Sequence, residues 1–425
     1  MNYPKVLIIS HNCFSASGSN GRTLNNFFSG YPKENLAQFY IYNEEPTLDI
    51  CDNYYRVTDK EALLSVIKRK GGKKIEKKNN KDDVYINDVS SYRKPKKTPL
   101  VYLIRELFWT IGGWKKKLGA WIDDFAPDVV LFQAGDASFL FDLAYCTAKK
   151  RGIPLVIYNS ESYYFKNKNF LQSSLASDFW YMILHRKFKR SVKKAVCYAD
   201  SSIYISDSLK KLYDDEFNMP SETIMTSTSL SESCDVIKKS EDIKISYLGN
   251  LGVGRYETLI SLAEIIGEIN HEYCIDVYGK ASQDIIEILE KTPGINYCGF
   301  VSYDACVCIM KESTILVHIE NFSDFYMEDS KYAFSTKIAD SLACGTCLFV
   351  YAPREMSVTE YLLGNGAACV ACNKNEASEK LKKLLSDPEA RKKYELCGIK
   401  VAKENHSIDR NRQKFWDVLN KAIES

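Results

Sequence analysis

The sequence predicts an α/β protein made of two domains, each built on a mostly parallel β-sheet. The chain has 425 residues, too many for one ordinary hydrophobic core, and 45% of them are apolar. Short apolar runs alternate with helical segments along both halves, which is the pattern of βαβ units. Residues 227–241, rich in Ser and acidic side chains, separate the halves and are expected to form the linker.

Strands of the first domain are expected at residues 5–10, 38–42, 128–133, 154–158 and 201–206. The first strand leads into a loop of small residues at 15–21 and then into a helical stretch at 22–28. This loop lacks the G-x-G-x-x-G spacing, so it does not predict a dinucleotide site. Residues 68–88 are short of apolar side chains and are expected to form an exposed insertion.

Strands of the second domain are expected at residues 244–248, 274–279, 295–301, 315–319, 347–351 and 367–371. Asp387 is placed to cap a helix that begins at Pro388. The last segment, 408–423, carries apolar residues at helical spacing and is expected to be a helix that packs on a core.

The most informative segment is residues 320–351, which joins two expected strands through a polar loop and a short helix. The helix is expected to open with Ser335 or Thr336 as its cap and to stop at Gly345. In an open α/β sheet such a loop lies at the carboxyl end of a strand, where ligands bind. Backbone amides at the helix start and the Lys337 ammonium then favour a phosphate site.

A glycine-rich turn follows the strand at 244–248. It contains Gly249, Asn250 and Gly252, and Arg255 stands just before the next helix. Glycines let backbone amides approach a ligand closely, and Arg255 adds a positive charge. A tight turn without a ligand explains the same glycines, but Lys337 in the same half favours the phosphate site.

Residues 334–345, FSTKIADSLACG, resemble the donor-binding segment of family-4-type GT-B glycosyltransferases. The resemblance implies the GT-B fold, in which two Rossmann-like domains with parallel sheets face an interdomain cleft. It also implies that loop amides, with Ser335 and Thr336, hold the diphosphate of a nucleotide sugar, and that Asp340 binds the ribose. Tyr332 stands where these enzymes carry a first acidic residue. Asn250 replaces their first basic residue, whereas Arg255 matches the second.

The same resemblance implies the domain boundaries. Residues 1–235 would form the acceptor-side domain and residues 242–405 the domain that binds the nucleotide sugar. The final helix, 406–425, would pack back on the first domain. Four residues of the small-residue loop would line the acceptor side of the cleft: Gly18, Ser19, Asn20 and Gly21. An ordinary flexible loop is the alternative for these four.

Residues 109–165 resemble capsular and exopolysaccharide glycosyltransferases. Two polar turns in this region follow expected strands and contain Asp136 and Glu161, the carboxylates available for catalysis on the acceptor side. Many relatives carry a His after one of these strands, and no His stands there in this sequence. Helix capping or plain surface exposure is the alternative role for each carboxylate.

Charge is unevenly divided, with a net +9 over the first 240 residues and −7 over the rest. Residues 91–125 combine basic clusters with aromatic side chains, including Trp109 and Trp114. Such a stretch suits a surface helix lying on an anionic membrane, with a core helix as an equally weighted alternative. Without a recognised nucleic-acid motif, we expect no nucleic-acid partner.

The 14 cysteines are expected to be reduced thiols in a cytoplasmic protein, because we find no secretory signal and no run of eighteen apolar residues. Cys344-x-x-Cys347 and Cys369-x-x-Cys372 raise the question of zinc. Because Cys369 and Cys372 should point to opposite faces of a strand, we expect ordinary core cysteines and no zinc.

These observations favour an enzyme that transfers a sugar from a nucleotide-diphosphate sugar to a saccharide acceptor, carried on a lipid, in surface polysaccharide synthesis. Arg255 and Lys337 would neutralise the departing diphosphate, so no divalent metal is expected. The resemblance implies retention of anomeric configuration. Two alternatives stay open: a GT-B sugar-nucleotide epimerase, and a peripheral membrane scaffold that has lost catalysis.

Overall fold

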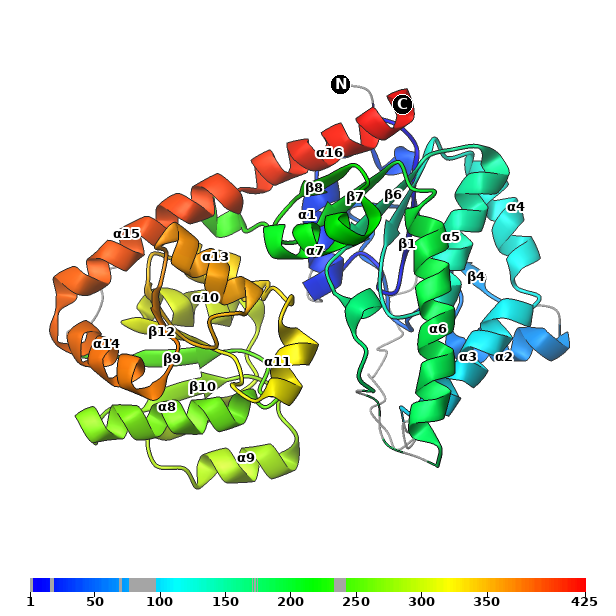
Figure 1. Cartoon of the computed structure of the whole chain (residues 1–425). Coiled ribbons are helices and arrows are strands. Elements are labelled where there is room, and N and C mark those ends of the chain that lie inside the picture. Colours follow the sequence, from blue (N-terminus) through cyan, green and yellow to red (C-terminus); the bar gives the residue numbers. More distant parts are fainter. Residues whose placement is uncertain are drawn as a thin grey trace, which may run out of the picture. The chain divides into compact units, whose positions relative to one another are not determined.

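The computed structural model describes residues 3–15, 19–68, 71–75, 97–169, 171, 173, 175–232 and 242–425. The chain divides into two compact units. Unit 1 comprises Met1–Ile224 and Arg412–Ser425, and unit 2 comprises Met225–Asn411. Each unit holds one sheet whose neighbouring strands are almost all parallel, which confirms the predicted fold class (Figure 1).

The sheet of unit 1 has the order β4-β3-β2-β1-β5-β6-β7-β8. Only the β3–β4 pair is antiparallel. Its strands are β1 (Val6–Ser10), β2 (Leu36–Tyr40), β3 (Asn53–Arg56), β4 (Lys73–Ile75), β5 (Val129–Gln133), β6 (Leu155–Asn159), β7 (Ser201–Tyr204) and β8 (Ser221–Thr223). β1, β2, β5 and β6 are buried throughout because helices cover both faces of a parallel sheet.

Three strands of unit 1 were not predicted from the sequence: β3, β4 and β8. They are three or four residues long, rich in polar side chains, and lie toward the two ends of the sheet. A strand near an edge needs no continuous apolar run, so periodicity does not reveal it. Of the expected insertion at 68–88, only residues 68 and 71–75 are described, and three of them form β4.

The α-helices of unit 1 are α1 (Ser19–Phe28), α2 (Asp59–Lys68), α3 (Pro99–Ile111), α4 (Lys115–Phe125), α5 (Ser138–Arg151), α6 (Ser177–Val196), α7 (Asp207–Phe217) and α16 (Ile408–Glu424), the last of which begins within unit 2. From Arg412 onward, α16 packs on the β1 side of unit 1. The Phe415 ring stacks on Phe27 at a centroid distance of 4.5 Å, and Trp416 Nε1 donates to the Phe27 carbonyl at 2.8 Å. The amphipathic spacing of 408–423 therefore reflects burial against this core.

The sheet of unit 2 has the order β11-β10-β9-β12-β13-β14 and is parallel throughout. Its strands are β9 (Ile245–Leu248), β10 (Ile275–Tyr278), β11 (Ile295–Gly299), β12 (Ile315–Ile319), β13 (Cys347–Tyr351) and β14 (Cys369–Ala371). Its helices are α8 (Arg255–Ile269), α9 (Gln283–Glu290), α10 (Tyr303–Glu312), α11 (Asp324–Ser330), α12 (Lys337–Ala343), α13 (Ser357–Asn365), α14 (Lys374–Ser386) and α15 (Pro388–Asn405). All six strands were expected from the sequence, but α11 lies where only a loop was expected.

The caps of unit 2 test two local predictions. Asp387 Oδ1 accepts from the Glu389 and Ala390 amides at 2.9 and 3.2 Å, which confirms the expected cap of α15. Thr336 occupies the N-cap position of α12, but its backbone is already helical and its side chain makes no capping hydrogen bond. The expected side-chain cap is therefore wrong at Thr336, because capping requires an extended backbone at that position.

The described part of the expected linker is packed rather than extended. Thr226 and Thr228 are buried, and the Thr228 amide donates to the His406 carbonyl at 2.9 Å. His406 is itself fully buried, with Nδ1 2.7 Å from the Thr226 carbonyl oxygen and Nε2 2.9 Å from the Tyr361 hydroxyl. The polar sequence predicts a linker here. The burial of these residues depends on partners far away in the chain, which the local sequence does not reveal. Residues 233–241 lie outside the described part of the chain.

The basic and aromatic stretch at 91–125 forms α3 and α4 from residue 99 onward, and residues 91–96 lie outside the described residues. Trp109 and Trp114 are fully buried, and Trp109 stacks on Phe139 at 4.3 Å. The prediction that these two tryptophans contact a membrane is therefore wrong, because both rings are buried in the core. In the described part of the chain, no helix is long and apolar enough to cross a bilayer.

Candidate functional site

Each sheet has one point where the strand order reverses direction. In unit 1 this point lies between β1 and β5, and in unit 2 it lies between β9 and β12. Open α/β sheets bind ligands outside the carboxyl ends of the strands at such a point. The residues that follow these four strands are therefore the first candidates for a functional site.

In unit 1 this position is occupied by His11, which directly follows β1, and Asp136, which follows β5 after a short turn. His11 Nε2 lies 3.4 Å from Asp136 Oδ1. The His11 carbonyl accepts from the Ile41 and Tyr42 amides at 3.2 and 3.0 Å, which fixes the loop. Gly135 leaves room for the ring, since a Cβ there would overlap it. The pair is a preorganised imidazole–carboxylate arrangement.

Electrostatics keep Asp136 ionised. Partial burial acts to raise the pKa of Asp136, but the facing His11 imidazole and the Arg105 guanidinium outweigh it, so the pKa lies below its ordinary value. Arg105 is itself held by Asp59, with Nε 2.9 Å from Oδ1. An ionised carboxylate beside an imidazole orients it and stabilises its protonated form, which suits proton transfer.

His11 was missed in the sequence. The resemblance to polysaccharide enzymes predicts a His only after the strands at 128–133 or 154–158. The signal that could have revealed it is its place at the carboxyl end of the first strand. Its significance depends on β1 and β5 being neighbours, which the register Val6↔Val129 establishes and periodicity does not.

The other acceptor-side residues are less clearly arranged. Glu161 follows β6 and is half-buried; its amide donates to Asn159 Oδ1 at 3.4 Å, and its carbonyl accepts from Tyr213 at 3.2 Å. Gly18 lies outside the described residues. Ser19, Asn20 and Gly21 form the first turn of α1, so the loop expected at 15–21 ends before residue 19. The turn packs closely, since a Cβ on Gly21 would lie 2.6 Å from the Cys13 carbonyl oxygen.

In unit 2 the corresponding point is occupied by Arg255, at the start of α8, and Glu320, directly after β12. Arg255 Nε and Nη2 donate to the two carboxylate oxygens of Glu320 at 3.0 and 2.8 Å. Burial acts to raise the pKa of Glu320, but His318 and Arg255 lower it overall. Arg255 was predicted to face a diphosphate. Here its guanidinium is engaged by a buried carboxylate, so its charge is largely balanced.

A cavity of about 350 Å³ lies in unit 2, at the carboxyl ends of β9, β10 and β11. Its lining residues are Gly249, Asn250, Tyr278, Gly279, Lys280, Phe300, Val301, Cys306 and Lys337. The structure thus brings together three predicted donor-binding residues, Gly249, Asn250 and Lys337. It adds Lys280, whose ammonium lies 4.2 Å from the centroid of the Phe300 ring.

Close backbone packing shapes this cavity. The Gly249 amide donates to the Tyr278 carbonyl at 3.0 Å, and a Cβ on Gly279 would overlap the Gly249 carbonyl. The Gly252 amide is 2.9 Å from Asn250 Oδ1, so the side chain of Asn250 stabilises its own turn. The glycines form a tight turn, and that turn is also part of the cavity wall. A tight turn and a ligand site are therefore compatible at this position.

The remaining predicted donor residues lie along α12. Ser335 accepts through its carbonyl from the Ile338 amide at 3.1 Å, and Lys337 is the first helical residue. Asp340 is buried, with Oδ1 accepting from the Tyr303 hydroxyl at 3.2 Å. It does not line the cavity.

Cysteines of the two C-x-x-C pairs lie in unit 2. Cys344, Cys347 and Cys369 are buried, and Cys372 is half-buried. In the described part of the chain, no three His, Cys, Asp or Glu side chains are grouped closely enough to hold a metal ion.

Residues 253–417 match a family described as glycosyl transferase-like. Sequence comparison with curated proteins finds no match. The sucrose-phosphate synthase of Thermosynechococcus elongatus is structurally similar, with a TM-score of 0.64 and 9% identity over 98% of both chains.

Two further solved structures are similar. The Anabaena protein HepE, in complex with UDP and glucose, has a TM-score of 0.61 and 10% identity, over 98% of this chain and 99% of that chain. A glycosyltransferase from Rickettsia africae has a TM-score of 0.60 and 13% identity over the full length of both. At such identities the likeness shows the shared fold, which is GT-B. The fold is thus that of GT-B glycosyltransferases, and residues 253–417, in the second half of the chain, match the glycosyl transferase-like family.

Proposed function

We propose that this glycosyltransferase uses a nucleotide-diphosphate sugar, with UDP-glucose as the first donor to test, and that unit 2 binds it. The observation that carries the proposal is the cavity at the carboxyl ends of β9, β10 and β11, where glycine backbone meets two lysines. HepE, whose structure was solved with UDP and with UDP-glucose, supports the choice of donor.

A donor site has to supply positive charge. Negative charge builds on the departing diphosphate, and positioned cations stabilise it. Lys337 and Lys280 on the cavity wall supply that charge, so the proposal needs no divalent metal. Arg255 acts by holding Glu320 and the turn at the start of α8. Asp340 does not line the cavity, so its assignment to the ribose rests on the resemblance of residues 334–345 alone.

We assign the acceptor to unit 1, where His11 and Asp136 receive the proton of the attacking hydroxyl. Glu161 and the first turn of α1, with Ser19, Asn20 and Gly21, belong to the same edge of the sheet. We keep retention of configuration as the proposed outcome, on the resemblance of residues 334–345. Proton NMR of the freshly formed product distinguishes retention from inversion.

For the acceptor we propose a saccharide carried on a lipid, in surface polysaccharide synthesis at the cytoplasmic face of a membrane. The supporting feature is α3, whose outward face is apolar. Its charged residues Arg105 and Glu106 point inward, to Asp59 and to Lys187 with Ser138. Four residues at i, i+4, i+7 and i+11 are 39–58% exposed: Leu100, Ile104, Leu107 and Ile111.

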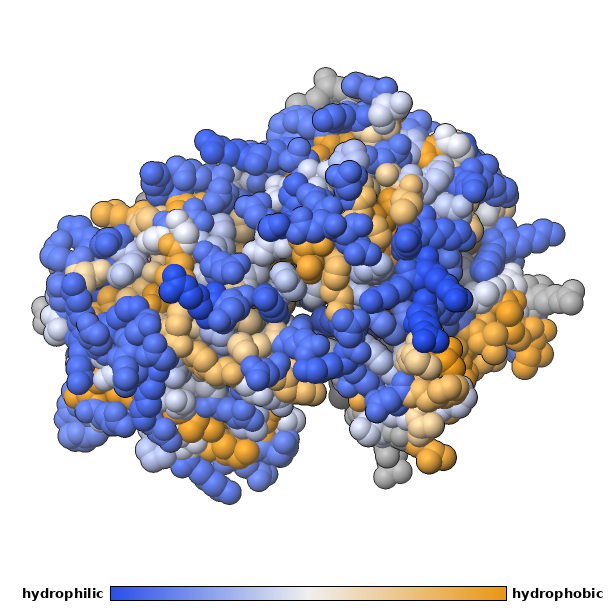
Figure 2. Space-filling model, in the orientation of Figure 1, coloured by the Kyte–Doolittle hydropathy of each residue, from blue (hydrophilic) through white to orange (hydrophobic). Residues whose placement is uncertain are grey.

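This apolar face has neighbours that extend it. Leu63, Leu64 and Ile67 of α2 are also exposed, and α2 packs beside α3. Figure 2 shows hydrophobic side chains gathered over this region of unit 1. Lys115–Lys117, at the start of α4, are exposed and add positive charge. Proteins bind anionic membranes through apolar faces of this kind that have a basic border. The membrane contact therefore moves from the tryptophans to the aliphatic residues of α3.

Donor use is tested by titrating UDP and UDP-glucose into the purified protein and measuring release of UDP with and without a lipid-linked acceptor. Transfer that requires the acceptor supports the proposal. Free sugar released without an acceptor would identify an epimerase or hydrolase, and no binding or turnover would favour the scaffold.

Membrane contact is tested by co-sedimentation with anionic vesicles. The double variant Ile104→Ser/Leu107→Ser should lose most vesicle binding while keeping UDP binding. Leu396→Ser, at a residue of α15 that is 61% exposed in unit 2, is the matched control and should sediment like the wild type. Equal sedimentation of all three proteins would contradict the assigned face.

A further inference from the structure

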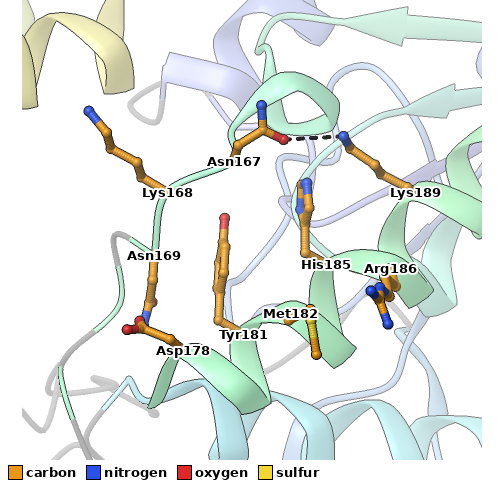
Figure 3. A pocket seen from close by; sticks show the side chains of 9 residues that line it. All are labelled: Asn167, Lys168, Asn169, Asp178, Tyr181, Met182, His185, Arg186 and Lys189. Atoms are coloured by element: carbon orange, nitrogen blue, oxygen red, sulfur yellow. Dashed lines mark hydrogen bonds between the residues drawn. The ribbon is translucent and has the colours of Figure 1, made fainter. Parts of the chain in front are cut away.

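A second cavity, of about 480 Å³, lies in unit 1 between the loop that follows β6 and the first half of α6. Its lining residues are Asn167, Lys168, Asn169, Asp178, Tyr181, Met182, His185, Arg186 and Lys189. Figure 3 shows Tyr181, His185 and Lys189 rising from α6 toward the loop that carries Asn167 and Lys168. None of these residues was singled out in the sequence, and none has a role in the proposed donor site.

The cavity is lined by more basic than acidic side chains. Three cations line it, Lys168, Arg186 and Lys189, against one acid, Asp178. Asp178 Oδ1 accepts from Asn169 Nδ2 at 3.2 Å. Lys189 Nζ contacts Asn167 Oδ1 at 3.3 Å and lies 5.2 Å from the centre of the Tyr164 ring. Among the ion pairs of the described residues, none involves Arg186 or Lys189.

His185 adds an unsatisfied polar atom to this wall. Its ring stacks on Tyr181 at a centroid distance of 5.5 Å and an interplanar angle of 8°. Its Nε2 is buried and has no hydrogen-bond partner in the described part of the protein. Burial, and then the nearby charge of Lys189, lower the pKa of His185. A buried nitrogen without a partner is costly, and a bound acceptor atom would remove that cost.

The position of the cavity connects it with the acceptor. Its loop extends from the carboxyl end of β6, and β6 pairs with β5 in the sheet whose carboxyl edge presents His11 and Asp136. A group bound there would belong to a molecule that approaches the same edge of unit 1. The ligand should be an anion with several acceptor oxygens, since it has to meet the Arg186 guanidinium and the Lys189 ammonium group.

We propose that this cavity binds a phosphoryl group of the acceptor substrate. The inference rests on the proposed function, in which unit 1 receives the acceptor. Arg186 and Lys189 hold the phosphoryl oxygens, His185 donates to one of them, and Tyr181 packs beside the adjoining group. Lys168 closes the loop side. The phosphoryl group could belong to a lipid headgroup or to a soluble sugar phosphate, and both have the same chemistry at this cavity.

Exposed apolar residues on the same helix favour the lipid source. Phe179, Met182 and Ile183 of α6 and Leu175 just before it are exposed, with Leu175 94% exposed. A phosphoryl group attached to an isoprenoid chain would place its charge in the cavity and leave its chain near these side chains.

The test is calorimetric titration of the full-length protein with three probes: inorganic pyrophosphate, farnesyl diphosphate and glucose 6-phosphate. The double variant Arg186→Gln/Lys189→Gln should weaken the binding of pyrophosphate by about tenfold or more, since two charge-assisted contacts are lost. Arg190→Gln/Lys193→Gln removes the same charge from two other exposed positions of α6 and should bind like the wild type.

The probes also distinguish the source of the phosphoryl group. Farnesyl diphosphate binding more tightly than pyrophosphate supports a lipid-linked acceptor, whereas glucose 6-phosphate binding more tightly supports a soluble one. In both cases, proton NMR of the imidazole of His185 should show its pKa rising when the probe is bound. His185→Gln identifies the signal.

Failure of this inference can be told apart from failure of the proposed function. UDP titration of each variant reports on unit 2 and should be unchanged. If the wild type binds UDP-glucose and transfers sugar, but both double variants bind pyrophosphate equally well, the cavity is not a phosphoryl site. If the wild type binds pyrophosphate at the cavity but never binds a nucleotide, the proposed function is wrong instead.

Discussion

His11 Nε2 and Asp136 Oδ1 lie 3.4 Å apart at the carboxyl ends of two adjacent parallel strands, β1 and β5. The strand order of the sheet reverses between these two strands, which is where α/β sheets bind ligands. The arrangement joins a group that can take up a proton to a carboxylate that orients it. We propose this pair as the catalytic centre of unit 1.

Asp136→Asn should lower turnover by about 10²–10⁴-fold, because the amide cannot stabilise the imidazolium form of His11. The affinity for UDP should not change, since Asp136 belongs to unit 1. Initial-rate kinetics and UDP titration measure the two effects. An equal loss in both would place Asp136 at the donor instead of the acceptor.

Gly135→Ala should cause a similar loss of activity although His11 and Asp136 are both unchanged. A Cβ at this position would overlap the His11 ring and displace it from Asp136. Gly119→Ala, in α4, is the matched control, because a Cβ there meets nothing within 4 Å. Alanine in a helix is about 0.5–1 kcal/mol better than glycine, so the control should be slightly more stable and fully active. Full activity of Gly135→Ala would mean that the position of His11 is unimportant.

Lys337→Ala should mainly affect UDP binding, whereas Arg255→Ala should mainly affect the stability of unit 2. Lys337 lines the donor cavity, so its loss should weaken UDP binding by about 1.5–3 kcal/mol without large effects on unfolding. Arg255→Ala leaves Glu320 buried without a partner and should destabilise unit 2 by about 3–5 kcal/mol. Denaturant unfolding and UDP titration of both variants separate these effects. The double variant Arg255→Met/Glu320→Met should recover part of the lost stability, because both buried charges are then absent.

His406 should make unit 2 less stable as the pH falls below neutrality. Burial lowers the pKa of His406 to about 4, and the hydrogen bond to Thr226 only partly opposes this. In the unfolded chain the imidazole takes up its proton at about pH 6.5, whereas in the folded protein it stays neutral until about pH 4. Stability should therefore fall by about 1.4 kcal/mol per pH unit between those values and change no further below about pH 4.

The measurement is denaturant unfolding of wild type and His406→Gln at pH 7.5 and 5.0, followed by a probe of unit 2. The variant should be less stable at pH 7.5 but should lose less stability on acidification. Identical pH dependence would mean that other groups, such as Glu320, cause the effect.

The sequence by itself determined the six strands of unit 2, where central strands such as β12 and β13 are largely apolar runs bounded by turn residues, but it did not reveal α11. It also determined the α/β class and the cap at Asp387, where local spacing is sufficient. It identified Gly249, Asn250 and Lys337, which the structure brings to one cavity. These predictions succeeded because hydrophobic periodicity and turn chemistry are local properties of the chain.

Only the tertiary structure decided which side chains meet. His11 and Asp136 are 125 positions apart, and their contact depends on β1 and β5 being neighbours. The sequence predicts Arg255 as a phosphate ligand, but its guanidinium is held by Glu320, which lies 65 positions further along the chain. Trp109 and Trp114 looked interfacial, but α3 turns them inward and presents aliphatic residues outward. In each case the helix or strand was evident from the sequence. Its direction and neighbours were not, because packing against distant residues sets them.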